Sequence, residues 1–241
     1  MSLIPENKKR DVQTSKKVKL YLYGSPMSGK TTFASGLPEP LMLNTDGNIQ
    51  YVDTPYIAVR DQITMKGRIK ETKFAWNVFK EAVDEIVAGQ HPYKTIVIDL
   101  IEDVYEACRV YMYNKLDIEH ESDAGYGKGY DMIKTEFLTS MKKIINSEYN
   151  IVLLSHDKVE EVKFKNGTSV TSYTVNLQEK IAKKIAGMVD ITARVILEDD
   201  KRFMDFTYND YIFGGNRIGL QQTKIPLNVE EFKKVFMGGN K

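Results

Sequence analysis

A glycine-rich segment near the start of the chain combines residue types that suit the binding of a polyphosphate. Glycines let backbone N–H groups turn inward around phosphates, a lysine reaches the β and γ oxygens, and a hydroxyl holds Mg²⁺. Gly24, Gly29, Lys30 and Thr31 fill those positions, after a strand-like run and before a short helical pattern. The pattern predicts a P-loop for ATP and Mg²⁺ with these binding residues: Gly24, Ser25, Pro26, Met27, Ser28, Gly29, Lys30, Thr31 and Thr32. The alternative interpretation is a glycine-rich turn that binds no ligand.

A magnesium–nucleotide site also needs a carboxylate near the metal. Asp99 ends the apolar run Thr95 to Ile98, where a Walker B residue would stand. It can hold the metal's water shell without entering the buried sheet, so we assign the metal to Thr31 and Asp99. The alternative is an aspartate that only caps the next helix.

Hydrolysis further requires a group that positions the attacking water. Asp46 and His156 each follow an apolar run, and neighbouring parallel strands bring their carboxyl ends to one crevice. The candidate catalytic set is therefore Lys30, Asp46, Asp99 and His156. The alternative for Asp46 is that Asp46-Gly47 only forms a tight turn. The alternative for His156 is that it has no function in catalysis.

The elements that must carry these groups follow from hydrophobic periodicity. Strands are expected at 18–23, 40–44, 93–99 and 150–156, with helices at 30–35, 74–88, 100–116 and 131–146. Apolar strands that alternate with helices predict an α/β fold with a mainly parallel sheet covered on both faces.

The second half has a different pattern. Residues 160–175 alternate and turn at Asn166-Gly167, a helix is expected at 177–187, and a second hairpin at 190–207. These patterns predict antiparallel strands added to the sheet edge. We expect a flexible basic arm at 1–17, one domain at 18–236 and a tail at 237–241.

The composition limits the functional classes. The chain has 241 residues, a net charge of +1 and a single cysteine, Cys108. One sizeable core, no internal disulfide and no apolar membrane segment are expected, which favours a cytoplasmic protein without membrane partners. The balanced charge gives no bulk signature of nucleic-acid binding, so any such surface must be local.

The order of parts resembles the RecA-like recombination ATPases, most closely small phage nucleotide-binding proteins of the single-strand annealing and recombination type. The resemblance covers residues 18–200 and implies a RecA-like core. In that family an acidic residue, usually Glu, ends the strand after the P-loop helix, and here the shorter Asp46 stands there. Asp99 matches the Walker B position and His156 the polar sensor.

The resemblance also implies two DNA-binding loops, at 125–130 and at 157–177. Glycines let the backbone approach phosphates, tyrosines offer stacking faces, and lysines supply charge. The candidate contacts to single-stranded DNA are Tyr126, Lys128, Tyr130, Lys158, Lys163 and Lys165, opposed by Glu160 and Glu161.

The resemblance finally implies a homo-oligomer, a ring or filament in which a neighbour supplies a basic residue to the γ-phosphate. Spacing selects none of the basic residues of the second half, which include Arg194, Lys201, Arg202, Arg217 and Lys224. The leading hypothesis is an Mg-ATP hydrolase that acts on single-stranded DNA. The alternatives are a P-loop kinase for a small molecule, which would need an arginine-rich lid, and a nucleotide-loaded adaptor without turnover.

Overall fold

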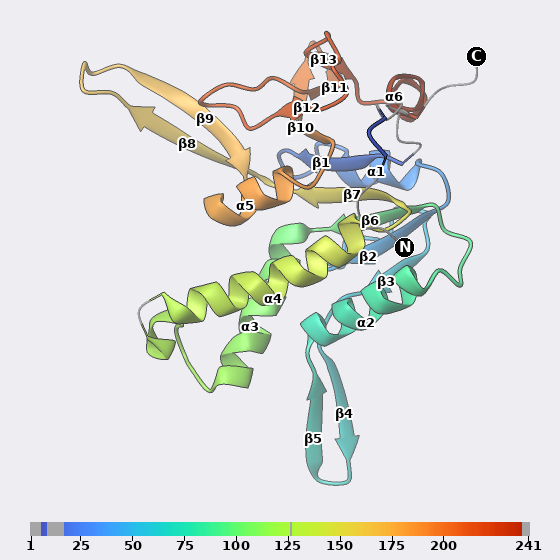
Figure 1. Ribbon diagram of the computed structural model, residues 1–241, viewed down its shortest axis with the longest axis vertical. Coiled ribbons are helices and arrows are strands. Elements are labelled where there is room, and N and C mark those ends of the chain that lie inside the picture. Colours follow the sequence, from blue (N-terminus) through green and yellow to red (C-terminus); the bar gives the residue numbers. More distant parts are fainter. Residues whose placement is uncertain (1–5, 9–16, 126, 238–241) are drawn as a thin grey trace.

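The central element is a nine-stranded sheet in the order β13-β11-β10-β1-β7-β6-β2-β3, with β12 paired to β10 (Figure 1). The computed structural model describes residues 6–8, 17–125 and 127–237. Most of the expected basic arm and nearly all of the expected tail lie outside these ranges. The strands of this sheet are β1 (Lys19–Tyr23), β2 (Pro40–Asn44), β3 (Tyr56–Ala58), β6 (Thr95–Asp99), β7 (Asn150–Ser155), β10 (Ile191–Glu198), β11 (Lys201–Asp205), β12 (Gly215–Asn216) and β13 (Lys224–Pro226).

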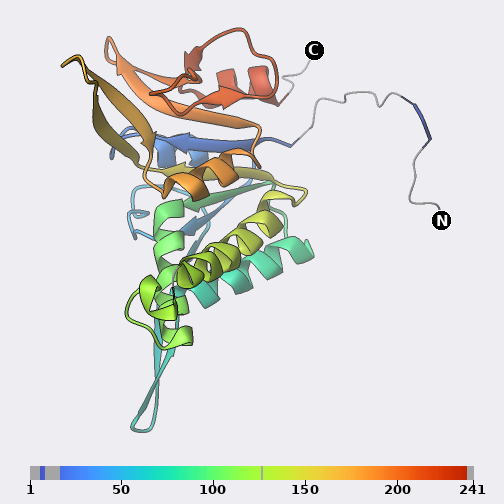
Figure 2. The ribbon, with the colours of Figure 1, turned by 60° about the vertical axis from the view of Figure 1, so that its left-hand side comes forward.

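Helices cover both faces of this sheet, because its central strands are apolar on both sides. In β1, Leu20 and Leu22 face one hydrophobic cluster while Tyr21 and Tyr23 face the other, and all four are buried. One face packs against α2 (Ala75–Ala88), α3 (Ile101–Leu116), α4 (Lys128–Ile145) and α5 (Glu179–Ala186), the other against α1 (Lys30–Ser35) and α6 (Val229–Phe236). Figure 2 shows α2, α3 and α4 packed together. The predicted α/β class with a mainly parallel sheet is confirmed.

The parallel register aligns the ends of four strands. Asn44 of β2 lies opposite Asp99 of β6, Asp99 lies opposite Leu154 of β7, and Tyr23 of β1 lies opposite Ser155. The residues that follow each strand therefore meet along one rim of the sheet.

The second half departs in part from its expected arrangement. Strands β11 and β13 do extend the sheet antiparallel, but β10 pairs parallel with β1. The first hairpin, β8 (Asp157–Lys163) and β9 (Ser169–Val175), forms a separate two-stranded sheet. Most of its residues are polar and exposed, so it gains little by packing into the core.

The expected loop at 125–130 is partly helical. Helix α4 begins at Lys128 rather than at Asp131, so Lys128 and Tyr130 belong to its first turn. A short 3₁₀ helix, η1 (Glu121–Ala124), precedes it. A Cβ at Gly129 would lie 2.3 Å from the carbonyl oxygen of Glu121, so glycine allows η1 and α4 to touch here.

Three strands lie in a part of the chain for which no element is predicted from sequence. β3 is the parallel edge strand beside β2. β4 (Gln62–Lys66) and β5 (Ile69–Lys73) form an antiparallel hairpin of exposed residues. Such strands bury too little apolar surface to show a clear hydrophobic pattern. Within the described ranges, none of the helices has the length and apolarity to cross a membrane.

Candidate nucleotide site

The P-loop closes around its own lysine. The Nζ atom of Lys30 donates to the carbonyl oxygens of Gly24 and Ser25 at 2.8 and 2.9 Å, and it lies 3.4 Å from the Ser28 hydroxyl. Lys30 is buried, and this burial lowers the pKa of its ammonium against the opposing effect of Asp99. The ammonium is thus held at the centre of the loop by acceptors that phosphate oxygens can replace.

The metal-ligand pair predicted from sequence is in contact. The Thr31 hydroxyl donates to Oδ2 of Asp99 at 2.9 Å. Asp99 is only 2% exposed, and burial raises the pKa of its carboxyl from 3.8 to about 6, with the Thr31 hydrogen bond opposing the shift. Hydroxyl and carboxylate oxygens are ligands that Mg²⁺ prefers, so the donor set fits a nucleotide-bound Mg²⁺.

Thr45 fastens the end of β2 to the end of β6. Its hydroxyl accepts a hydrogen bond from the backbone N–H of Leu100 at 2.9 Å and donates to the Asp103 carboxylate at 2.9 Å. The backbone N–H of Thr45 also donates to the carbonyl of Asp99 at 2.8 Å. These contacts fix the strand end that precedes Asp46 beside Asp99.

Asp46 is engaged in a turn and also lies near the metal ligand. Its carboxylate accepts hydrogen bonds from the Asn44 side chain and from the backbone and side chain of Asn48, at 2.9 to 3.1 Å. Burial acts to raise the pKa of Asp46, but these hydrogen bonds outweigh it and the net pKa is lowered. One lone pair of Oδ2 is left to accept from a water molecule, so the turn and the water-positioning role are compatible.

His156 is held by an acidic residue that strand-end reasoning missed. Glu102 accepts from the backbone N–H of His156 at 2.8 Å and lies 3.1 Å from its Nδ1. Burial raises the pKa of the Glu102 carboxyl. Glu102 is in the first turn of α3, just after Asp99, and a search for acidic residues in that turn would have found it.

Two arginines of the second half lie beside the P-loop in the same subunit. An open pocket of about 430 Å³ lies between residues 25–28 and strands β10 and β11, and it is lined by both Arg194 and Arg202. A Cβ at Gly29 would lie 3.4 Å from the Cδ of Arg202, so this side chain runs along the loop. Arg194 lies beside the P-loop because it is paired with Tyr23, the last residue of β1, in the β1–β10 register. The spacing of residues in the sequence does not reveal this pairing.

Arg194 connects the P-loop to the β8–β9 hairpin. Its guanidinium lies 3.5 Å from the Asp157 carboxylate and 3.4 Å from the centre of the Tyr173 ring. Asp157, the first residue of β8, in turn accepts from the Ser25 hydroxyl at 3.1 Å. A continuous set of polar contacts therefore joins the phosphate loop to both strands of the hairpin.

The candidate DNA contacts do not gather at one place. Tyr126 lies outside the described residues. Lys128 and Tyr130 belong to the first turn of α4. Figure 1 shows the start of α4 at a different corner of the molecule from the β8–β9 hairpin. On the hairpin, Lys158 and Lys163 pair with the glutamates that oppose them, Glu160 at 2.6 Å and Glu161 at 3.8 Å, while Lys165 lies at the turn.

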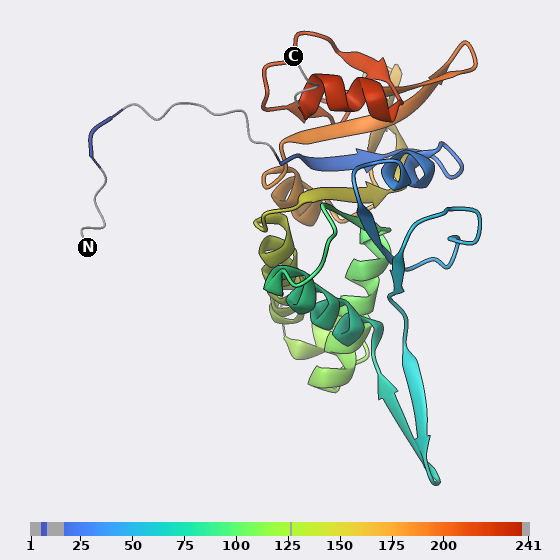
Figure 3. The ribbon, with the colours of Figure 1, turned by 90° about the vertical axis from the view of Figure 1, so that its right-hand side faces the viewer.

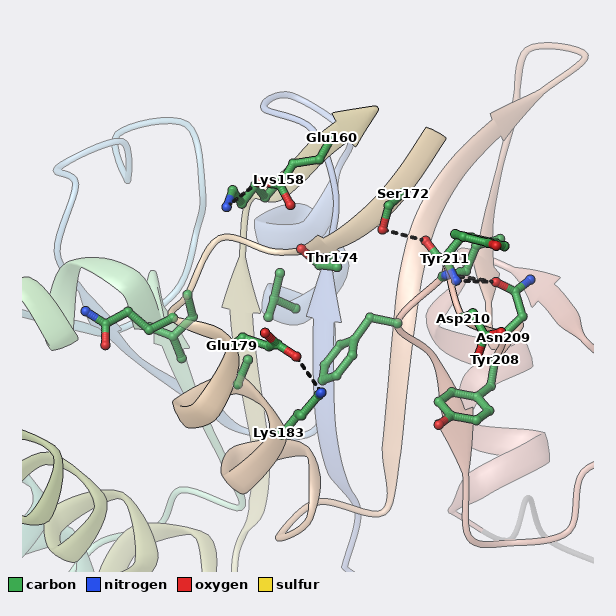
Figure 4. Close-up of a pocket in the computed structure, with 16 residues that line it drawn as sticks. Lys158, Glu160, Ser172, Thr174, Glu179, Lys183, Tyr208, Asn209, Asp210 and Tyr211 are labelled. Carbon is green, nitrogen blue, oxygen red and sulfur yellow. Dashed lines mark hydrogen bonds and ion pairs between the residues drawn. The ribbon is translucent and has the colours of Figure 1, made fainter. Parts of the chain in front are cut away.

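A second cavity, of about 580 Å³, lies between the β8–β9 hairpin, α5 and residues 208–213 (Figure 4). Its two lining lysines are both neutralised, Lys158 by Glu160 and Lys183 by Glu179. Tyr208 and Tyr211 add aromatic surface. Polar and apolar side chains both line the cavity, and because its two lysines are already paired it is not set up to receive a phosphate.

Comparison with known families agrees with this geometry. A family model described as an AAA domain matches residues 16–218, which include the P-loop, Asp99, His156 and both arginines. A search of curated proteins finds no match.

Asp99→Asn should stabilise the metal-free protein at neutral pH. The pKa of Asp99 is raised on folding, so this group favours the folded state below pH 4 and loses that contribution as pH rises through about 6. Chemical unfolding in EDTA should show the variant about 1 to 3 kcal/mol more stable at pH 8, with the difference vanishing towards pH 4.

Asp46→Asn is the matched control and should behave oppositely. The pKa of Asp46 is lowered on folding, so its charge stabilises the native state above its unfolded pKa. The variant should be less stable than wild type at pH 8 and approach it in acid. Equal effects of the two substitutions would show that burial of Asp99 carries no electrostatic cost.

Proposed function

Because this chain belongs to the AAA domain family of P-loop ATPases, we propose that it hydrolyses Mg-ATP and acts on single-stranded DNA. In this proposal it is a RecA-like phage protein of annealing or recombination. The observation that carries the nucleotide part is the 2.9 Å contact between Thr31 and Asp99 at the mouth of the P-loop. It joins the phosphate-binding helix to the acidic strand end that a metal–nucleotide site needs.

In this proposal each residue at the rim of the sheet has a separate role in ATP hydrolysis. Lys30 binds the β and γ oxygens. Thr31 and Asp99 would hold Mg²⁺, and the bound ion would supply positive charge to the phosphates. Asp46 accepts a hydrogen bond from the attacking water through its remaining lone pair. His156, oriented by Glu102, donates to the γ-phosphate or to that water.

Contacts at the base of the β8–β9 hairpin support a link between nucleotide and DNA. His156 is the residue between β7 and β8 and contacts Glu102, and Asp157, the first residue of β8, contacts the P-loop residue Ser25. A change in the loop on nucleotide binding therefore acts directly on the hairpin. In the proposal, Lys165 at its turn and Lys128 at the start of α4 contact the DNA backbone.

The proposal includes a homo-oligomer, a ring or filament. The resemblance implied that a neighbouring subunit supplies a basic residue to the γ-phosphate. Arg202 of the same subunit already lies along the P-loop and can supply that charge instead. In the described part of the chain, the guanidinium of Arg202 has no ion-pair partner, so it is available to a phosphate.

A nucleotide-loaded adaptor is the second candidate, and Asp46 is the reason to keep it. Its carboxylate is shorter than the usual glutamate and accepts three hydrogen bonds within its own turn. Tight ATP binding with negligible turnover under every DNA condition would favour this candidate.

Single-stranded DNA should stimulate ATP hydrolysis by wild type, and Lys30→Ala should lower turnover at least about 100-fold, because it removes a cation from the transferring phosphoryl group. Hydrolysis is measured with and without DNA at about 50 and 200 mM salt, since phosphate contacts weaken as salt rises. Lys30-dependent turnover that ignores DNA, with no DNA binding, would contradict the DNA part and retain the ATPase part.

Arg202→Ala should weaken ATP binding about tenfold, the loss expected for one charge-assisted hydrogen bond. Lys201→Ala, which removes the same charge from the adjacent exposed residue, should leave it unchanged. Titration with a non-hydrolysable ATP analogue measures both. If the two variants bind equally, Arg202 does not contact the nucleotide of its own subunit.

A further inference from the structure

The hairpin formed by β4 and β5, residues 62–73 and here called the ribbon, projects away from the body of the molecule (Figures 1 and 3). Among the described residues its two strands pair with each other and with no other strand. An isolated two-stranded hairpin is only marginally stable in water. Packing against a partner would bury the exposed side chains of such a hairpin and stabilise it.

The two faces of the ribbon differ in chemistry. In the cross-strand register, Ile63 lies opposite Thr72 and Met65 lies opposite Lys70, so these residues share one face. Ile63 and Met65 are 59% and 61% exposed. This face has no carboxylate and is here called the open face.

The acidic residues of this region are already engaged. Asp61, at the base of the ribbon, accepts a hydrogen bond from the backbone N–H of Ala75 and so caps α2. Glu71, on the face opposite the open face, forms an ion pair with Lys66 at 2.8 Å. Neither carboxylate neutralises the open face.

A positive charge remains after these pairings. Lys73 is paired with Glu81 of α2. Arg60 at the base, Arg68 in the turn and Lys70 on the open face have no ion-pair partner among the residues that the structure describes. The ribbon thus presents unpaired cations together with exposed aliphatic side chains.

We propose that the ribbon binds double-stranded DNA by lying in a groove with its open face towards the bases. A groove of B-DNA admits a two-stranded β-ribbon, and the phosphates on either side complement Arg68 and Lys70. Exposed Ile and Met are the kinds of side chain that insert at base steps from a groove. Residues 60–73 contain no aromatic ring, so the ribbon lacks the stacking platform that single strands use.

This duplex site is separate from the nucleotide site and from the proposed single-strand contacts. It gives the protein a means of holding a duplex while a single strand is bound elsewhere. Duplex binding at the ribbon does not require ATP hydrolysis, so this proposal can be confirmed or contradicted independently of the proposed ATPase function.

The test uses the full-length protein and fluorescence anisotropy with a labelled duplex and, separately, a labelled single strand. Arg68→Ala combined with Lys70→Ala should weaken duplex binding about tenfold or more and reduce the salt slope by about two. Lys142→Ala combined with Lys184→Ala removes the same charge from exposed sites on α4 and α5 and should change neither quantity.

The apolar contribution has its own matched pair. Met65→Ser, on the open face, should weaken duplex binding without changing the salt slope. Ile69→Ser, similarly exposed at 68% but on the opposite face, should not. Affinity for the single strand and the rate of ATP hydrolysis should stay at wild-type values in all these variants.

Three results would overturn the proposal: no duplex binding by wild type, equal loss in the ribbon and control variants, or a loss confined to the single strand. Sedimentation of the same variants identifies the main competitor. If the ribbon substitutions dissociate an oligomer and leave duplex affinity intact, the ribbon binds a second copy of the chain rather than DNA.

Discussion

The arrangement of this molecule depends on the common parallel register of β1, β7, β6 and β2. It brings the residues after four strands to one rim, where each can act on the same ligand. The hydrogen bond between Thr31 and Asp99 spans that rim and connects the P-loop helix to β6. Without this alignment, the Asp99 carboxylate would not lie beside the glycine-rich loop.

This alignment places a carboxylate where water cannot reach it. Asp99 is buried beside Lys30 and near Glu102, and its raised pKa shows that the metal-free site is electrostatically unfavourable for the charged form. A bound divalent cation would relieve this cost, because it restores the charge balance lost on burial. If the site binds Mg²⁺ as proposed, the burial of Asp99 lowers the stability of the metal-free protein and favours metal binding, as is common at functional centres.

Strand ends were predictable from sequence because apolar runs and their terminal polar residues are local signals. Asp99 is an example, and its contact with Thr31 follows from the fold class. Glu102 was missed because it lies in the first turn of a helix, and the prediction considered only the residues at strand ends. The position of Arg202 was not predictable because it depends on β10 pairing with β1, a contact between residues far apart in the chain. The ribbon was not predicted because its exposed strands show little hydrophobic periodicity.

The most direct test of the central claim is a double-mutant cycle on Mg²⁺-dependent ATP binding, with Thr31→Val, Asp99→Asn and the combination. If both residues hold one metal, each single variant abolishes the gain in affinity that Mg²⁺ gives. The double variant should then lose no more than either single one, with a coupling energy of about 1 to 3 kcal/mol. Additive losses, or ATP affinity that ignores Mg²⁺ in wild type, would contradict a shared metal site at this contact.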